Sequence, residues 1–290
     1  QELDGSFEIH ELCRLRYNYF RYNDKIGLIL RIIKTSVPTI EELKLSKVIN
    51  QICQQKRGLI LVTGPTGSGK STTMAAMINE INQNSASHII TIEDPIEYIH
   101  QQQKSRITQR EIGKDTANFT TGLRSALRQD PDVLLIGEMR DSETISTALK
   151  AAETGHLVLA TVHTTNIIST ITRIIAMFPH DEQQEIKKRL AENLYATIGQ
   201  RMLKGVVKNS IVLAQEIMIT GPGIKECIIG KEDMSRIRNI LNNSKNKDEI
   251  HGQSFDKHIM ELYKDGRISK ETALSSVDTQ ADFLQKLVIE

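Results

Sequence analysis

Short apolar runs alternate with longer amphipathic segments along most of the chain. Four runs have the length and apolar content of buried strands: Gly58–Thr63, His88–Ile92, Val133–Ile136 and Leu157–Val162. The segments around them have the apolar spacing of helices, at Lys70–Asn82, Gly122–Arg128, Glu143–Glu153 and Asn166–Phe178. Alternating signals of this kind predict an α/β fold, with a mostly parallel sheet and helices on its faces.

The segment before this alternation has a different pattern. Short alternating apolar positions flank a polar turn at Asn23–Lys25 and predict a β-rich piece over residues 6–34. Pro38 interrupts the pattern, so the chain that follows is predicted to form a linker. Because the chain begins directly on strand-like segments, we expect that an N-terminal part of this piece is missing.

The segment after the alternation begins with one long apolar stripe. Ile186, Leu190, Leu194 and Ile198 are four residues apart, which predicts a helix over Asp181–Gln200. Beyond it, a strand pair is predicted at Gln200–Lys204 and Ile211–Met218, and then short helices with a flexible loop at Asn242–Asp248. The predicted parts are a β-rich piece at 1–34, a linker at 35–45, a core at 46–220 and a helical region at 221–290.

The composition excludes several classes of protein. The 290 residues carry 37 basic and 36 acidic side chains, so no overall positive field attracts nucleic acid. Trp is absent and only 4% of residues are aromatic, so a base-stacking surface is not expected. No apolar run approaches the ~18–20 residues that cross a bilayer. Cys13, Cys53 and Cys227 are far apart, which argues against a disulfide framework and fits a reducing cytoplasm.

A glycine-rich loop carries the clearest chemical signal. Gly64–Ser71 matches the pattern G-x-x-x-x-G-K-[ST], between a predicted strand and a predicted helix. Its backbone N–H groups cradle phosphates, Lys70 reaches the β- and γ-phosphates, and the Ser71 hydroxyl is predicted to bind Mg²⁺. A chance glycine turn is the alternative, but the strand and helix around the loop disfavour it. The predicted ATP-binding residues of this loop are Gly64, Pro65, Thr66, Gly67, Ser68, Gly69, Lys70, Ser71 and Thr72.

Carboxylates follow two of the predicted strands. Glu138 comes just after Val133–Ile136, at the edge of an α/β sheet where ligands bind, and is predicted to act with the metal. A simple ion pair with Arg140 is its alternative role. Glu97 ends a cluster of three carboxylates at 93–97, which could activate water beside a γ-phosphate or form only a solvated acidic turn. The residues alone leave this second choice open.

Histidines and arginines complete the candidate groups. His156 and His163 bracket the strand Leu157–Val162, where they could sense phosphates or satisfy hydrogen bonds within the core. Guanidinium groups can neutralise a transferring phosphoryl group, although surface ion pairing is the default role of any one arginine. The candidate arginines are Arg16, Arg31, Arg124, Arg128, Arg140 and Arg173.

These blocks, in this order, resemble the secretion ATPase superfamily of type IV pilus and type II secretion motors. The runs that carry the resemblance are GPTGSGKSTT, TIEDPIE, LRSALRQDPD, GEMRD and AAETGHLV. Within the superfamily the chain is most similar to the ATPases that retract type IV pili, over nearly its whole length. The resemblance implies a RecA-like P-loop core and a hexameric ring. It also implies an N-terminal PAS-like domain, of which residues 1–34 are the C-terminal part.

The resemblance also implies roles for single residues. Glu97 matches the catalytic glutamate of the family's acidic box, and Glu138 matches the Walker B residue that acts through Mg²⁺. His156 and His163 match the histidine box, and His163 is predicted to join Lys70, Glu97 and Glu138 in catalysis. His156 and the candidate arginines are predicted to contact the nucleotide, with Arg16 and Arg31 closing onto it from the N-terminal part.

Two departures from the family's patterns concern the direction of the motor. Gly223–Gly230 stands where retraction ATPases carry the motif AIRNLIRE and keeps few of its charged residues. The four-cysteine metal site typical of assembly and secretion ATPases is also missing from the sequence. The resemblance therefore leaves open whether the motor retracts or extends a pilus.

The leading hypothesis is a hexameric motor in the cytoplasm, at the inner face of the cell membrane. It hydrolyses ATP with Mg²⁺ and passes force to an inner-membrane platform protein of the pilus. The alternatives are an extension or secretion ATPase of the same superfamily and, less favoured because no basic aromatic loop is found, a DNA translocase. A ring subunit that binds nucleotide without hydrolysing it ranks last, because the expected catalytic groups are present.

Overall fold

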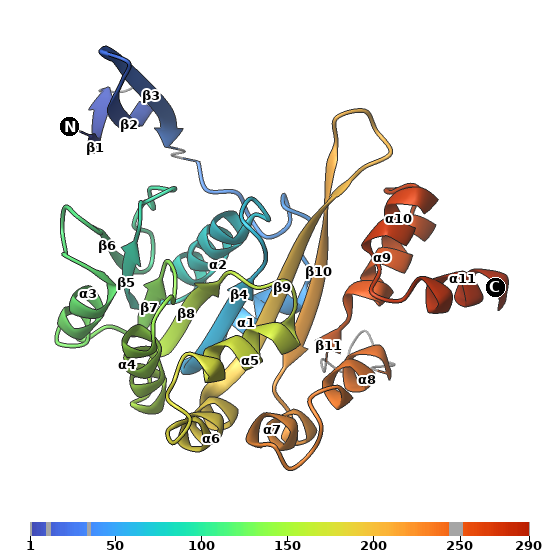
Figure 1. Ribbon diagram of the computed structural model, residues 1–290. Helices are drawn as coiled ribbons and strands as arrows, with labels where there is room; N and C mark the ends of the chain where they lie inside the picture. Colours follow the sequence, from blue (N-terminus) through green and yellow to red (C-terminus); the bar gives the residue numbers. More distant parts are fainter. Residues whose placement is uncertain (1, 10–12, 34–35, 244–251, 290) are drawn as a thin grey trace.

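The computed structural model describes residues 2–9, 13–33, 36–243 and 252–289. Figure 1 shows an α/β core, a small separate sheet at the N-terminal end and a group of helices at the C-terminal end. The α/β class that the sequence predicts is confirmed. Within the described residues, no helix has the length and apolar character needed to cross a membrane.

The core is built on one eight-stranded sheet. Its spatial order is β11-β10-β9-β4-β8-β7-β5-β6, and the strands from β9 to β6 are parallel, whereas β10 and β11 are antiparallel additions. The strands are β4 (Gly58–Thr63), β5 (His88–Glu93), β6 (Arg106–Glu111), β7 (Val133–Ile136), β8 (Leu157–Val162), β9 (Leu194–Lys204), β10 (Ile211–Ile219) and β11 (Gly252–Gln253). Every residue of β4, β7 and β8 is buried, because helices cover both faces of a parallel sheet.

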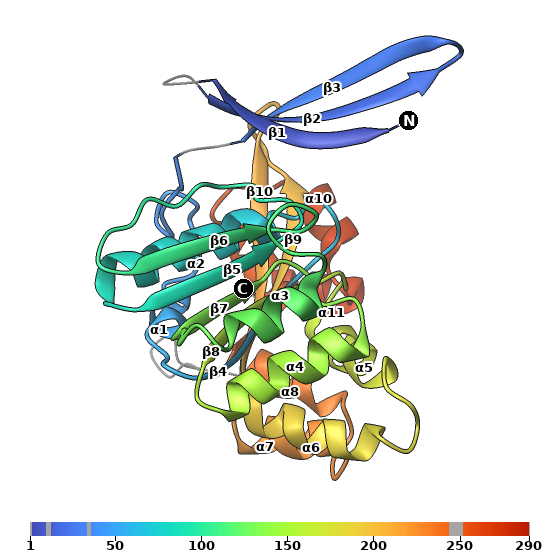
Figure 2. The ribbon, with the colours of Figure 1, turned by 90° about the vertical axis from the view of Figure 1, so that its left-hand side faces the viewer.

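Helices pack on both faces of this sheet, as the two views in Figures 1 and 2 show. One face carries α1 (Val48–Cys53) and α2 (Lys70–Asn84), whose Ile52 and Met77 are fully buried. The other face carries α3 (Phe119–Ala126), α4 (Ser142–Glu153), α5 (Ile167–Ala176), α6 (Gln183–Asn193), α7 (Pro222–Ile229) and α8 (Arg236–Asn243). The two apolar layers hold the sheet between them and fix where its strands end.

Polar capping residues define where three of these helices begin. The side chains of Asn118, Asp141 and Asn166 each accept a hydrogen bond from a backbone N–H in the first turn of α3, α4 and α5. Such a cap stabilises a helix by about 1 kcal/mol, since it satisfies a donor that has no partner within the helix. The three helices are therefore anchored at the same edge of the sheet, next to the strand ends.

The predicted helix over Asp181–Gln200 is wrong in its second half. Helix α6 ends at Asn193, and Leu194 begins β9, whose residues pair with β4 in parallel register. Ile198 thus lies opposite Val62 in the sheet. A spacing of four apolar residues does not by itself separate a helix from a buried strand. The surroundings of β4 favour the strand. Because β4 is fully buried, the backbone groups along its edge need hydrogen-bond partners, and β9 supplies them.

Two strands were absent from the sequence prediction. The edge strand β6 has the sequence RITQRE, with little apolar content, and β11 has only two residues. Both lie at the borders of the sheet, where burial does not impose an apolar pattern. In the predicted loop at 242–248, the first two residues end α8 and residues 244–248 lie outside the described part of the chain.

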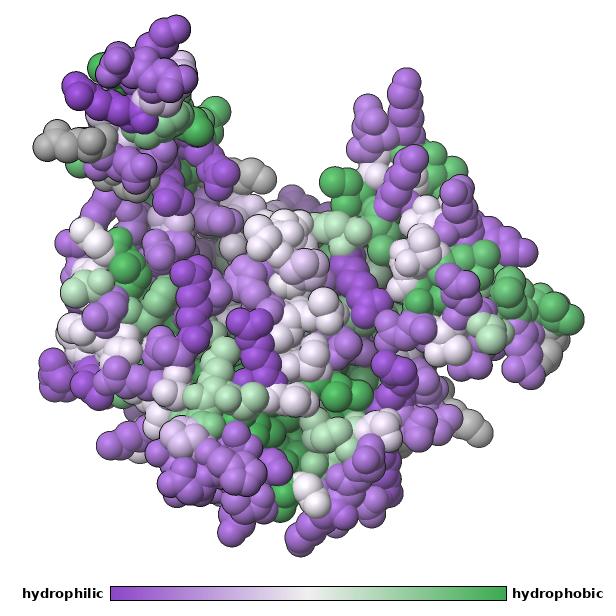
Figure 3. Space-filling view, in the orientation of Figure 1, coloured by the Kyte–Doolittle hydropathy of each residue, from purple (hydrophilic) through white to green (hydrophobic). Residues whose placement is uncertain are grey.

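The N-terminal part is a three-stranded antiparallel sheet of β1 (Leu3–Ile9), β2 (Cys13–Tyr22) and β3 (Lys25–Ile33). A two-residue turn at Asn23 and Asp24, both with positive φ, joins β2 to β3 as the sequence predicts. The sheet exposes large apolar side chains, several of them more than half exposed. They include Leu3, Ile26, Leu28, Ile29 and Ile32. In the view of Figure 3, apolar residues are scattered among hydrophilic ones in this part of the molecule. Its assignment as part of a PAS-like domain stays a prediction.

The C-terminal helices pack on the long β9–β10 hairpin. They are α9 (Phe255–Lys264), α10 (Lys270–Ser276) and α11 (Gln280–Ile289). Phe255 and Ile259 of α9 lie in one buried cluster with Leu203 of β9 and Ala214 of β10. The short helices predicted for this region are confirmed, and they form a satellite core beside the main sheet.

A buried carboxylate joins this hairpin to α5. Glu216 of β10 is 8% exposed, and its Oε2 accepts a hydrogen bond of 3.0 Å from the backbone N–H of Ile167. Nearby, the guanidinium of Arg201 lies 3.9 Å from the ring centroid of Phe255 and donates to Asp278 at 3.1 Å. Burial raises the pKa of Glu216 to about 7, more than the Ile167 hydrogen bond and the Arg201 charge lower it.

Replacement of Glu216 by Gln tests the effect of this burial on stability. Because the folded-state pKa of Glu216 is raised to about 7 from 4.5, the wild type loses stability as the pH rises through this window. Gln keeps an acceptor for Ile167 and does not ionise. We expect Glu216→Gln to raise the free energy of unfolding by about 1–3 kcal/mol at roughly pH 8 and by almost nothing at roughly pH 4. Denaturant titration at both pH values measures the free energy of unfolding, with Glu271→Gln at an exposed position as control. An equal increase at both pH values would contradict the raised pKa of Glu216.

Candidate active site

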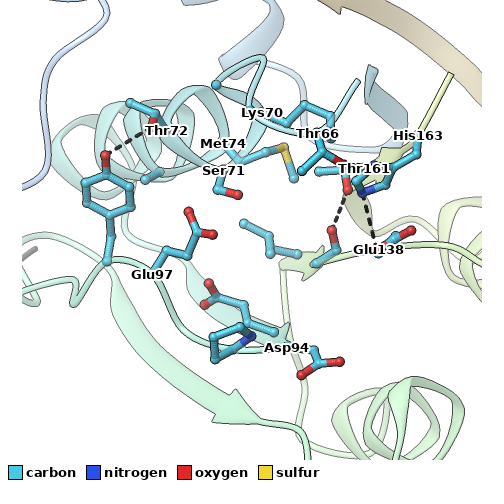
Figure 4. A pocket seen from close by; sticks show the side chains of 18 of the residues that line it. Thr66, Lys70, Ser71, Thr72, Met74, Asp94, Glu97, Glu138, Thr161 and His163 are labelled. Carbon is cyan, nitrogen blue, oxygen red and sulfur yellow. Dashed lines mark hydrogen bonds and ion pairs between the residues drawn. The ribbon is translucent and has the colours of Figure 1, made fainter. Parts of the chain in front are cut away.

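A cavity of about 500 Å³ opens at the carboxyl ends of the parallel strands β5, β7 and β8, beside the loop that follows β4. Figure 4 shows that Ser71, Glu97 and Glu138 point into it from different elements. The predicted residues that line this cavity are Thr66, Gly67, Gly69, Lys70, Ser71, Thr72, Glu97, Glu138, Arg140 and His163. The fold therefore brings the phosphate loop and the candidate carboxylates to one place.

The loop after β4 has the backbone that its glycines allow. Gly69 has φ 87° and stands as the left-handed N-cap residue of α2. At Gly64, an added Cβ would lie 2.6 Å from the carbonyl oxygen of Gln200, so only glycine fits. Gly64, Pro65 and Ser68 form the back of the loop rather than the cavity wall. The backbone N–H groups at the start of α2 are thus available for phosphate oxygens.

Lys70 is held inside this loop. Its Nζ donates hydrogen bonds to the carbonyl oxygens of Gly64 at 2.9 Å and Pro65 at 3.0 Å, and the residue is 7% exposed. Burial lowers the pKa of Lys70, and the negative charges of Glu138 and Glu97 oppose that shift. The ammonium group therefore sits between the loop and two carboxylates that share its cavity.

Glu138 is the most heavily paired carboxylate of the cavity. Its Oε2 lies 2.6 Å from a guanidinium nitrogen of Arg140 and 3.4 Å from Nε2 of His163. Burial would raise the pKa of Glu138, but the Arg140 hydrogen bond and the charges of His163, Arg140 and Lys70 outweigh it and lower the pKa. Glu138 is thus ionised at neutral pH. The ion pair with Arg140 is present and Glu138 also lines the cavity, whereas its action with a metal stays a prediction.

The strand-end histidines lie in different places. His163 follows β8 at the cavity, where its Nδ1 lies 3.5 Å from the Thr66 hydroxyl. Burial lowers the pKa of His163 most, and the positive charge of Lys70 lowers it further. His156 precedes β8, so it lies at the opposite edge of the sheet, where its Nδ1 is 2.9 Å from the Ala151 carbonyl oxygen.

The predicted arginines are also divided. Arg140 lines the cavity, and Arg173 donates to the carbonyl oxygen of His163 at 3.3 Å. Arg124 and Arg128 lie on exposed parts of α3 and its end, and Arg124 forms an ion pair of 2.8 Å with Glu143. Arg16 and Arg31 of the N-terminal sheet line a smaller space of about 180 Å³ together with Thr72 and Glu97.

Glu93 is a cavity residue that was not selected from the sequence. It ends β5, and its Oε1 accepts hydrogen bonds from the Thr91 hydroxyl at 2.6 Å and from Nε2 of Gln109 at 3.2 Å. Burial raises the pKa of Glu93 to about 7, and the neighbouring carboxylates of Glu97 and Glu111 add to that shift. Its position at the end of a predicted buried strand was the signal that could have identified it.

Three buried threonines join the phosphate loop to the histidine loop. Thr63, which ends β4, and Thr164, which follows His163, share a short hydroxyl–hydroxyl hydrogen bond. Thr170 of α5 bonds to Thr164 at 2.6 Å and to Thr63 at 3.1 Å. Because all three are buried, this triangle fixes the spacing between the two loops.

The donor set around Ser71 and Glu138 fits Mg²⁺ held together with a nucleotide. One hydroxyl and one ionised carboxylate line the cavity beside the phosphate loop. Mg²⁺ is usually held by one or two protein oxygens together with substrate phosphates and water. No group of three or more His, Cys, Asp or Glu side chains among the described residues could hold a metal ion by itself. The site therefore suits a metal that arrives with phosphate.

A phosphate loop at the central strand, with the ionised carboxylate of Glu138 after a nearby strand, defines a P-loop ATPase. The family described as "Type II/IV secretion system protein" matches residues 20–286, and the chain belongs to this family. Like the relatives that it matches, it is an ATPase.

The similar proteins include pilus motors. The type IV pilus retraction ATPase PilT of Pseudomonas aeruginosa is 43% identical over 282 residues, which cover 97% of this chain and 80% of that protein. A twitching motility protein of Neisseria gonorrhoeae is 44% identical over 94% of this chain and 72% of its own length. The crystal structure of the pilus retraction motor PilT with bound ADP superposes with a TM-score of 0.90 at 40% identity, covering 98% of this chain and 80% of that one.

The threonine triangle yields a prediction about stability. Thr170→Val keeps the shape of the side chain but leaves the buried hydroxyls of Thr63 and Thr164 with one partner fewer. We expect the free energy of unfolding to fall by about 1–3 kcal/mol, since a buried polar group loses its hydrogen bond. Urea denaturation measures the change, with Thr147→Val on the exposed side of α4 as control. Equal stability of the two variants would show that the triangle contributes nothing.

Proposed function

We propose that this chain is an ATP-hydrolysing motor of a type IV pilus system. The observation that carries the proposal is the shared cavity of Lys70, Ser71, Glu97 and Glu138, beside a loop built for phosphates. A binding protein needs only the loop, whereas hydrolysis also needs a base for water and groups that offset charge. All three kinds of group face the same cavity.

Each group has a defined part in hydrolysis. The loop N–H groups and Lys70 hold the β- and γ-phosphates and offset charge as the γ-phosphoryl group transfers. Glu97 takes a proton from the water whose oxygen attacks the γ-phosphorus, while the bond to the bridging oxygen breaks and ADP leaves with its electrons. Ser71 and Glu138 would hold Mg²⁺, which further offsets phosphate charge when bound. Arg140 and His163 keep Glu138 in place.

A second cavity, of about 630 Å³, adjoins the first and shares Gly69, Thr72 and Met202 with it. Its other walls are largely apolar and include Leu43, Val206, Val207, Ile211 and Leu213. Its volume lies in the range of small-molecule sites. We infer that the base and ribose of ATP extend into this cavity from phosphates held at the loop.

Several features support a ring of subunits. The N-terminal sheet exposes several large apolar side chains, and groups of exposed apolar side chains can mark protein interfaces. Arg124, Arg128 and His156 lie outside the subunit's own cavity, where a neighbouring subunit's nucleotide could meet them. Arg16 and Arg31 lie beside Glu97 and Thr72, so movement of the N-terminal sheet would change the charge around Glu97. We propose a homo-hexamer on this basis.

Retraction is the direction that the comparisons support best. Identity to the retraction ATPase PilT extends over nearly the whole chain, and the type IV pilus ATPase PilU of Pseudomonas aeruginosa is 40% identical over 97% of it. Similarity to the type II secretion protein E of Aeromonas hydrophila covers only 54%. The altered motif at Gly223–Gly230 covers most of helix α7 (Pro222–Ile229) and its C-cap, and its Ile224, Cys227 and Ile228 are buried. We propose that the ring acts on a platform protein at the cytoplasmic face of the inner membrane.

Hydrolysis is tested with Lys70→Ala and Glu97→Gln. Loss of the ammonium or of the base removes stabilisation of the transition state, so turnover should fall at least about 100-fold in each variant. Phosphate release from Mg·ATP measures it, with the exposed Lys56→Ala as control. Wild-type turnover in both variants would contradict the proposed function. Stimulation of turnover by DNA would favour a translocase.

The base cavity is tested with Ile211→Asn. Ile211 is 71% exposed and lines the second cavity, so its replacement should leave the fold intact. Loss of apolar contact should weaken ATP binding by about 3- to 10-fold, while the affinity for inorganic tripolyphosphate stays unchanged. Competition against a fluorescent nucleotide measures both, and Leu284→Asn on α11 is the control. If ATP and tripolyphosphate both bound more weakly by the same factor, the adenine base would lie outside the second cavity.

A further inference from the structure

The edge strand β6 controls the loop that carries Glu97. Chain 94–100 leaves the end of β5 and runs beside β6, which pairs with β5 in parallel register. Glu97 is in the middle of this loop, outside any helix or strand. The position of its carboxylate therefore depends on what holds the loop backbone on each side of it.

The side-chain amide of Gln109, on β6, binds the loop through both its nitrogen and its oxygen. Its Nε2 donates to the carbonyl oxygen of Tyr98 at 2.9 Å and to Oε1 of Glu93 at 3.2 Å. Its Oε1 accepts from the backbone N–H of His100 at 2.9 Å. A side-chain amide can donate and accept at once, which a carboxylate or an ammonium group cannot do.

Two further contacts secure the loop around Glu97. Glu111, on the same face of β6 as Gln109, accepts from the backbone N–H of Ile96 at 3.3 Å. The hydroxyl of Tyr98 lies 3.0 Å from the Thr72 hydroxyl in the first turn of α2. Tyr98 is 4% exposed, so this contact is shielded from water. Figure 4 shows Thr72 with its hydrogen bond and Glu97 pointing into the cavity.

These contacts connect Glu97 to the phosphate loop by a short, closed path. Residues on both sides of Glu97 are bound to β6, and Tyr98 is also bound to the helix that begins with Lys70. Catalysis is sensitive to such placement, because a displacement of about 1 Å at a reacting group can cost roughly 100-fold in rate. Gln109 itself is absent from the cavity wall, so it acts on Glu97 without touching nucleotide.

We propose that Gln109 is a positioning residue, which sets the distance between the Glu97 carboxylate and the γ-phosphate by holding the backbone at Tyr98 and His100. The proposal rests on the proposed hydrolysis of ATP. It extends the functional part of the molecule from the strand ends to an edge strand that the family motifs do not include. Because Gln109 also donates to Glu93 at the end of β5, it joins that carboxylate to the loop that carries Glu97.

The test compares turnover with nucleotide affinity. Gln109→Met keeps the length of the side chain but removes its three hydrogen bonds, so kcat should fall about 10- to 100-fold. The KM for ATP and the affinity for a non-hydrolysable analogue should stay within about twofold, because the phosphate loop is unchanged. The control is Gln103→Met, since Gln103 is exposed and its side chain donates a long hydrogen bond to Asn79, at 3.4 Å.

A double substitution separates positioning from a structural role. In a Glu97→Gln background, Gln109→Met should lower kcat by less than about twofold, because the group it positions is already gone. If Gln109→Met unfolds the protein, Tyr98→Phe, which removes the hydrogen bond between the Tyr98 hydroxyl and Thr72, should show the same dependence on Glu97. Equal losses of kcat in the two backgrounds, or a loss of ATP affinity as large as the loss of kcat, would overturn the proposal. An inactive wild type would overturn the proposed hydrolysis instead.

Discussion

Parallel pairing of the buried strand β4 with β8 and β9 is the interaction on which the rest of the structure depends. All residues of β4 are buried, so both of its edges must find backbone partners. Because parallel strands end on the same side, this pairing sets the phosphate loop after β4 beside the His163 loop after β8. The threonine triangle of Thr63, Thr164 and Thr170 then fixes the two loops to each other.

Charge within the cavity is distributed by the surroundings of each carboxylate. Glu138 stays ionised because Arg140 and His163 contact it, whereas burial raises the pKa of Glu93 to about 7. The buried ammonium group of Lys70 interacts with the negative charges of both Glu138 and Glu97. A nucleotide brings further negative charge, which this cation and Mg²⁺ can offset. Two carboxylates of one cavity thus have different protonation preferences, a pattern typical of catalytic sites.

Apolar pattern predicted four strands that are buried in the sheet, and it failed at an edge strand and at the buried first half of β9. The runs at β4, β5, β7 and β8 were found because burial excludes polar residues from them. Edge strand β6 was missed because only part of its surface is covered, and Leu194 was assigned to a helix because a spacing of four residues fits more than one structure. The phosphate loop and Glu138 were predictable, since their chemistry needs fixed residue types at fixed spacing.

The sequence by itself determined the α/β class, the phosphate loop and the family, because these depend on local pattern and short motifs. Tertiary structure decided which candidate residues share a cavity. It brought Glu97, Glu138 and His163 to Lys70, and it placed His156, Arg124 and Arg128 elsewhere. It also revealed Glu93 and Gln109, whose contacts join residues from different strands. Such contacts have no signature in a single sequence, since strand order and register alone bring these side chains together.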